Sequence, residues 1–217
     1  MSGYITFWSQ DYVKELRKAG DSGQFKVVYG SHHTRMPYIS SLKIGDIVYP
    51  TAILNGTLCI MARLPVEKLE PAFDYLIRET GQVFGSLTPE GVLLRSTLRG
   101  KDYYYTSGDC GFADKIKLPD NIHTVIDEKN LTPLPHQFHQ EPITCCAKQA
   151  ASGSHGSVIQ AREIPFEKIP ELRFGKTPDS QKPLKLDKNG KLRSTSLAGF
   201  IRKLSDETFQ YFESFFS

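Results

Sequence analysis

The residues best suited to binding chemistry lie in a short polar stretch that follows Gly30. Arg35 carries a planar guanidinium that can form two hydrogen bonds to one phosphate, and aromatic rings can stack on an unpaired base. Adjacent histidines in an extended chain point in different directions, so a metal clamp is not expected here. The stretch predicts a binding loop, with an ordinary polar loop as the alternative. Its candidate nucleic-acid-binding residues are Trp8, Ser31, His32, His33, Arg35 and Tyr38.

A second candidate surface is basic and lies toward the C-terminus. The segment from Arg162 to Lys203 contains eleven basic and five acidic residues, and a basic stripe of this kind can neutralise phosphates. Asn189-Gly190 is typical of a hairpin turn, so it predicts that the flanking lysines project from a β-hairpin. A solvated edge hairpin is the alternative, because lysines also protect sheet edges from aggregation. The candidate residues are Lys182, Lys185, Lys188, Lys191 and Arg193.

Other clusters carry weaker signals. Ser152–Ser157 could present backbone N–H groups to an anion, but P-loop spacing is absent and a flexible hairpin loop is the better interpretation. The set His136, His139, Cys145 and Cys146 lacks the spacing usual in structural zinc sites. Nothing local marks the orienting group that a Cys–His nucleophile needs. We therefore predict no metal, no cofactor and no catalytic residue.

Composition predicts a globular protein of the cell interior. The chain has 217 residues, of which 39% are hydrophobic and 24% charged, and its net charge is only +3. Its four cysteines form no CxxC pair, which favours reduced thiols in the cytoplasm. Polar residues after Trp8 interrupt any signal-peptide pattern, and no apolar stretch approaches the roughly 20 residues of a membrane span. We expect a cytoplasmic protein without membrane contact.

Local patterns predict the elements that must position these groups. Ser9 and Ser205 are typical helix N-caps, Gly20 and Gly81 are typical helix ends, and Asn55-Gly56 is a strong hairpin signal. We expect strands at 4–8, 25–29, 47–54, 57–64, 92–98 and 102–106, with a turn at Gly100 between the last two. We expect helices after Ser9, over 67–79 and after Ser205, where Phe209, Phe212 and Phe216 share a face, and mostly loop over 107–141.

The sequence also contains an internal echo. Residues 56–69 and 156–169 align without a gap, with a glycine, a proline, a glutamate and a lysine at matching positions. Proline suits the first turn of a helix, where its missing N–H is not needed. The echo predicts a duplicated unit, in which 57–64 and 157–164 are strands that are each followed at once by a helical turn.

The stretch Ser41–Pro50, with its Lys-x-Gly-Asp turn, then Asn55-Gly56, Arg63 and the Pro65–Lys68 turn resembles the PUA-like superfamily, near its ASCH and EVE branches. The resemblance covers roughly residues 4–106. It implies a small β-barrel used to bind RNA, or flipped modified bases in DNA, in a pocket near the first helix. It implies no chemistry by default, although some ASCH relatives are nucleases or amidohydrolases.

These observations predict an α+β protein with a PUA-like small barrel or curved mixed sheet over 1–106, and a C-terminal α+β region over 107–217. The leading function is a non-catalytic nucleic-acid-binding module that recognises a modified or unstacked base. One alternative is a protein-interaction role, such as an antitoxin or immunity protein. A second is an ASCH-like nuclease or hydrolase, which needs convergent acidic, lysine or tyrosine groups in the pocket.

Overall fold

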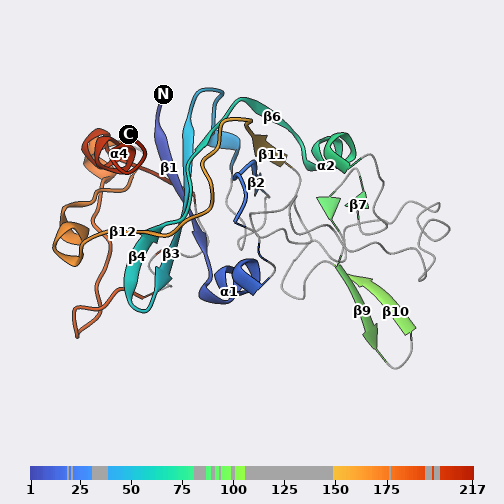
Figure 1. Cartoon of the computed structure of the whole chain (residues 1–217), viewed down its shortest axis with the longest axis horizontal. Coiled ribbons are helices and arrows are strands. Elements are labelled where there is room, and N and C mark those ends of the chain that lie inside the picture. Colours follow the sequence, from blue (N-terminus) through green and yellow to red (C-terminus); the bar gives the residue numbers. More distant parts are fainter. Residues whose placement is uncertain are drawn as a thin grey trace.

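Two larger β-sheets, two strand pairs and several short helices form the described fold (Figure 1). The computed structural model describes residues 1–18, 20, 22–30, 39–80, 87–88, 91–92, 94–98, 101–105, 149–175, 177–193, 197 and 201–217. The fold class is mixed α+β, as predicted. No helix among the described residues is long and apolar enough to cross a membrane.

The larger sheet has six strands in the order β12-β4-β3-β1-β13, with β5 pairing beside β4 on β3. Its strands are β1 (Gly3–Trp8), β3 (Ile47–Leu54), β4 (Thr57–Ile60), β5 (Leu64–Pro65), β12 (Arg162–Glu163) and β13 (Arg202–Lys203). β1 and β3 are parallel, and the other pairs are antiparallel. The predicted hairpin turn between β3 and β4 is confirmed, since Asn55 and Gly56 have φ of 52° and 86°, as a tight hairpin turn requires.

The smaller sheet has three antiparallel strands, with β11 (Gln149–Ser152) between β2 (Val27–Gly30) and β6 (Lys68–Pro71). β11, β12 and β13 all come from the part of the chain beyond residue 106. The two predicted regions therefore share both sheets. Each described sheet is an open path with two edges, so no closed barrel is formed by the strands that the structure describes.

The helix predicted for 67–79 begins later than expected. Lys68–Pro71 forms β6, and α2 spans Ala72–Thr80. Proline disfavours helical backbone in the residue before it, so Pro71 keeps Glu70 extended. Glu70 also pairs with Ala150 of β11, a long-range partner that no local pattern reveals. Apolar residues do recur at helical spacing in this segment, but its first residues form a strand.

Two hydrophobic cores lie on opposite faces of the six-stranded sheet, because alternate residues of a strand point to opposite sides. Along β1, Tyr4 and Trp8 enter the first core, whereas Ile5 and Phe7 enter the second. Helix α1 (Gln10–Lys18) covers the first core with Val13 and Leu16. Helix α4 (Asp206–Glu213) covers the second with Phe209 and Phe212 and lies at the left of Figure 1.

Both predicted N-caps are confirmed. The backbone N–H of Tyr12 donates to the Ser9 hydroxyl over 3.1 Å, and that of Thr208 donates to the Ser205 hydroxyl over 3.2 Å. Gly20 has φ of 69° just beyond α1, as a helix-ending glycine often does. Each of these interactions joins residues that are close in the sequence, so the helix ends could be predicted from the sequence alone.

Short 3-10 turns and hairpins complete the described chain. The 3-10 turns are η1 (Ile39–Ser41), η4 (Phe166–Glu171) and η5 (Pro178–Ser180). The predicted hairpin around residue 100 is confirmed by β9 (Leu94–Leu98) and β10 (Lys101–Tyr105), which pair antiparallel, and β7 (Leu87–Thr88) pairs likewise with β8 (Gly91–Val92).

The two echo segments pair with each other. Arg162 lies opposite Ile60, and the N–H groups of Ile164 and Ser157 donate to the carbonyls of Leu58 and Arg63, each over 2.8 Å. In the second segment only Arg162–Glu163 forms a strand, so the strand predicted over 157–164 is mostly wrong, but the predicted helical turn follows as η4. The first is followed by β5 and β6, so the predicted helical turn after residue 64 is wrong. The physical reason is that β5 and β6 both find long-range strand partners.

Candidate nucleic-acid interface

The basic hairpin is built around one carboxylate. The Asp187 side chain accepts hydrogen bonds from the backbone N–H groups of Asn189 and Lys191, both over 2.9 Å. Arg193 Nε lies 3.2 Å from the same side chain, and Gly190 has φ of 72°. The Lys191 N–H bond, followed by those from Asn189 and Arg193, lowers the pKa of Asp187 despite the opposing effect of desolvation. The turn predicted at Asn189-Gly190 is therefore confirmed, and the charged side chain of Asp187 stabilises it.

Apolar residues anchor this hairpin to the second core. Leu184 and Leu192 are buried, and Leu186 packs against the same cluster while bridging to Leu192. Leu186 and Leu192 form an isolated bridge, so the hairpin is shorter than the sequence pattern suggested. The fixed base means that the polar side chains of the hairpin project from a defined position on the molecule.

The structure brings all five predicted basic residues of this segment to the surface. Residues 182–193 contain one acidic residue, Asp187, whose side chain is 13% exposed. Because Asp187 bonds the backbone of its own turn, it neutralises the cations only in part, and the Arg193 side chain beside it stays 68% exposed. The exposed residues are Lys182, Lys185, Lys188, Lys191 and Arg193. In Figure 1 the segment is the orange loop at the lower left.

Trp8 is placed differently from expectation. Its side chain is 0% exposed and packs edge-on against Tyr12 and Phe25, with ring centroids 5.3 and 5.6 Å away. No base can stack on a ring that is covered in this way, so the predicted binding role of Trp8 is wrong for this structure. The physical reason is that both faces of β1 are covered by a core. Ser31, His32, His33, Arg35 and Tyr38 lie outside the described residues.

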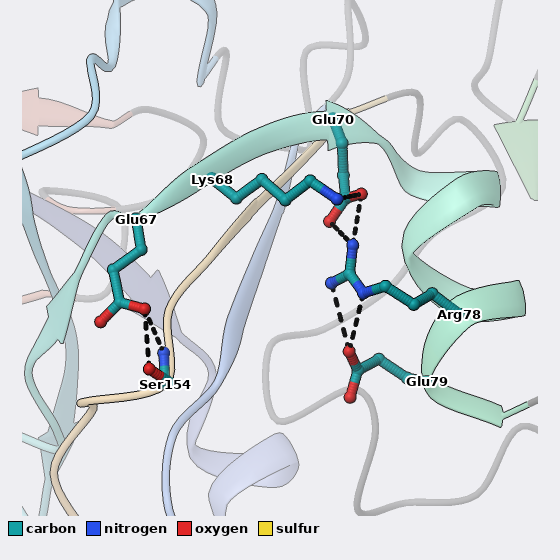
Figure 2. A network of polar contacts seen from close by, with 6 residues as sticks. All are labelled: Glu67, Lys68, Glu70, Arg78, Glu79 and Ser154. Carbon is teal, nitrogen blue, oxygen red and sulfur yellow. Dashed lines mark hydrogen bonds and ion pairs between the residues drawn. The ribbon is translucent and has the colours of Figure 1, made fainter.

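The Ser152–Ser157 turn is occupied by a side chain of the protein itself. The Ser154 N–H and hydroxyl donate to Glu67 Oε2 over 2.9 and 2.8 Å (Figure 2), and His155 Nδ1 lies 2.5 Å from Oε1. A Cβ on Gly156 would lie 1.8 Å from the Phe25 carbonyl oxygen, so the chain requires glycine there. The Ser154 N–H, then the His155 and Ser154 side chains, lower the pKa of Glu67 to about 2. Hydrogen bonds to Glu67 thus stabilise this turn.

A polar cleft of about 320 Å³ opens between this turn, β6 and α2. Lys68 Nζ and Arg78 lie 2.6 and 2.5 Å from Glu70, and Arg78 also contacts Glu79 at 3.1 Å, as Figure 2 shows. Burial alone would raise the pKa of Glu70, but its hydrogen bonds to Arg78 and Lys68 bring that pKa below the usual value. Lys68 and Arg78 each have a carboxylate partner. This pairing makes the network suited to joining β6 to α2 rather than to taking an anion.

Metal and thiol chemistry have little basis in the described residues. Among them no group of three His, Cys, Asp or Glu side chains is placed to hold a metal ion. Cys59 is a buried free thiol, and burial raises its pKa to about 11, which disfavours the reactive thiolate. The His136, His139, Cys145 and Cys146 set lies outside the described residues.

Sequence reasoning missed Asp187 and Glu67, the two acidic residues that fix these turns. Asp187 had a usable signal, because an aspartate two residues before an Asn-Gly pair commonly bonds the turn backbone. Glu67 had none, since its partners lie 87 and 88 residues away in the chain. No family model matches this sequence, and no curated protein matches it either.

Proposed function

We propose that this protein binds the phosphate backbone of a nucleic acid through the basic hairpin of residues 182–193. The observation that carries the proposal is the exposure of five cationic side chains on a turn held in place by Asp187 and by two buried leucines. A fixed array loses less conformational entropy on binding than a flexible one. Lysines act as point charges toward phosphate, so this contact is independent of base sequence.

Charge pairing favours the hairpin over the polar cleft as the anion site. In the cleft, Lys68 and Arg78 already face Glu70, and Arg78 also faces Glu79. A phosphate placed there would have to compete with those carboxylates. On the hairpin, Asp187 is the one acidic residue among the five cations, and its oxygens bond the turn backbone. The hairpin thus has a net positive field that attracts phosphate.

The resemblance of residues 4–106 to the PUA-like superfamily supports the same ligand class. The Gly45-Asp46 turn and the Asn55-Gly56 hairpin that carry this resemblance are both present as turns in the structure. We extend the proposal to a PUA-like origin for this half of the chain and to a non-catalytic role in the cytoplasm. Under this proposal the hairpin supplies affinity, and base recognition belongs to another surface.

A salt titration tests the proposal. Fluorescence anisotropy should compare wild type with Lys188→Ala/Lys191→Ala on single- and double-stranded RNA and DNA, including methylated DNA. Removing two phosphate contacts should weaken binding on all sequences alike and reduce the log–log salt slope by roughly two. Lys18→Ala/Lys43→Ala is a matched control, because it removes two exposed lysines that lie outside the hairpin.

Two results would contradict the proposal. The first is that wild type binds none of the nucleic acids, which would favour a protein partner instead. The second is that the control pair weakens binding as much as the hairpin pair does, because the effect would then come from net charge rather than from the hairpin.

A further inference from the structure

Side chains of β1 point alternately to the two faces of the sheet, and one aromatic ring among them stays partly exposed. Trp8 points into the first core and is fully covered, whereas its neighbour Phe7 points to the opposite face of the sheet. Phe7 packs at the margin of the second core and keeps part of its side chain in solvent. The basic hairpin packs on this same core through its leucines. A partly exposed aromatic ring and the cationic hairpin therefore share one side of the sheet.

Arg202 lies beside Phe7 on that side. In β13, Arg202 lies directly opposite Ile5 of β1. Phe7 is two residues beyond Ile5, so it is the diagonal neighbour of Arg202, and the Cα atoms of such a pair lie about 7–8 Å apart. Directly paired residues project to the same face, and Ile5 belongs to the second core. Arg202 thus projects toward the face that carries Phe7 and the basic hairpin. Lys203, its neighbour in β13, is opposite Tyr4 and projects to the other face.

Among the residues that the structure describes, Arg202 differs from the other half-buried arginines in having no partner. Arg63 forms two hydrogen bonds with Glu213, and Arg162 donates to the Gln160 carbonyl and covers the Phe216 ring. Arg173 donates to the carbonyls of Pro170 and Leu172. Within the described parts of the chain, no hydrogen bond or ion pair is found for the Arg202 side chain. Its desolvation lowers its pKa.

An unpaired, partly desolvated guanidinium is a strong site for an anion. It has already lost part of its hydration, so binding a phosphate costs it less, and the lower local dielectric strengthens the attraction. Its planar fork can form two hydrogen bonds to one phosphate. Aromatic rings hold unpaired bases by stacking, irrespective of base identity. Arg202 and Phe7 together therefore provide the two contacts that one unpaired nucleotide needs.

We propose that Phe7 and Arg202 hold one unpaired nucleotide, with its base on the Phe7 ring and its phosphate on the Arg202 guanidinium. This inference rests on the proposed function and makes it more specific, because it selects single-stranded over double-stranded nucleic acid. The basic hairpin on the same side of the sheet supplies contacts to neighbouring phosphates. The site replaces the stacking role that the sequence pattern assigned to Trp8.

The test uses the full chain and fluorescein-labelled 20-nucleotide RNA and DNA of mixed sequence, each as a single strand and as a duplex. Phe7→Leu keeps an apolar side chain in the core and removes the stacking ring. It should weaken single-strand binding by about fivefold or more and leave duplex binding within twofold. Arg202→Ala should weaken single-strand binding at least as much, and Arg202→Lys should not restore it, because lysine lacks the planar fork.

Lys203→Ala is the matched control, since it removes a charge from the same strand on the opposite face. It should leave single-strand affinity within about twofold. Trp8 fluorescence and the unfolding midpoint of each variant show whether the fold is kept. If wild type binds single strands but Phe7→Leu and Arg202→Ala bind as Lys203→Ala does, the nucleotide site is wrong and the hairpin proposal stands. If wild type binds no nucleic acid, the proposed function itself fails.

Discussion

At the scale of residues, two carboxylates determine the geometry of two turns of this protein. Glu67 fixes the Ser152–Ser157 turn and Asp187 fixes the basic hairpin. In each case a carboxylate takes up backbone N–H groups that a turn would otherwise expose, an arrangement that favours the charged form. The two turns are thus tied to ionisation states, which makes them sensitive to acid.

Glu67→Gln should destabilise the protein at neutral pH, because the amide cannot act as a charged acceptor for Ser154. The pKa of Glu67 is lowered from 4.5 to about 2 in the folded protein. The stabilisation from its charge is therefore complete above about pH 4.5 and is lost as the pH falls toward 2. Urea midpoints of wild type and Glu67→Gln should differ at pH 7 and converge below pH 3. A difference that is independent of pH would show that the charge is irrelevant.

At the scale of elements, helix α4 is attached to the sheet by packing and by one polar cluster. Tyr49 donates to Glu213 over 2.5 Å, and Arg63 donates to both oxygens of the same carboxylate over 2.7 and 2.9 Å. The Arg63 and Glu213 side chains are 24% and 28% exposed. Burial, then the hydrogen bond and the charge of Glu213, raise the pKa of Tyr49 well above its ordinary value, so this phenol remains a donor.

Glu213→Ala should destabilise the protein by about 1–2 kcal/mol, because it leaves Tyr49 and Arg63 without their acceptor in a half-buried site. The value is below the range for a fully buried pair, since solvent still reaches both partners. Chemical denaturation at pH 7 measures the change in unfolding free energy. Gln210→Ala on the exposed side of the same helix is the control. Equal losses in the two variants would assign the effect to helix propensity instead.

Short-range signals made several elements predictable, and long-range pairing explains the misses. The caps at Ser9 and Ser205 and the Asn55-Gly56 turn depend on atoms within a few residues, so their positions could be predicted. β6 had one local signal, because Pro71 disfavours helical backbone at Glu70, but the pairing of Glu70 with Ala150 of β11 could not be predicted. The basic hairpin of the candidate site was predictable from its turn and its lysines. The burial of Trp8 was not, because it depends on α1 and Phe25 closing over one face of β1.

At the scale of the whole molecule, the N-terminal half depends on the C-terminal half. β11 is the central strand of the three-stranded sheet, and β12 and β13 form both edges of the larger one. A fragment of residues 1–106 would leave β2 and β6 without their shared partner, and it would lack α4 over the second core. We expect this fragment to show no cooperative unfolding transition, whereas the full chain should unfold cooperatively.

Circular dichroism during urea titration and the amide dispersion of NMR spectra distinguish the two cases. The full-length protein, prepared and measured in the same way, is the reference. A fragment with dispersed amide signals and a sigmoidal transition would show that residues 1–106 fold independently, and the shared sheets would then be a secondary association.

The central position of β11 has a consequence for synthesis on the ribosome. β6 is complete at Pro71, but β11 begins only at Gln149. At roughly 5–20 residues per second, the nascent chain therefore carries two unpaired strands for about 4–16 seconds before their common neighbour is translated. Exposed strand edges invite association with other chains. We expect this interval to be the period of greatest chaperone demand, and slowing translation between residues 71 and 149 should increase aggregation of the newly made protein.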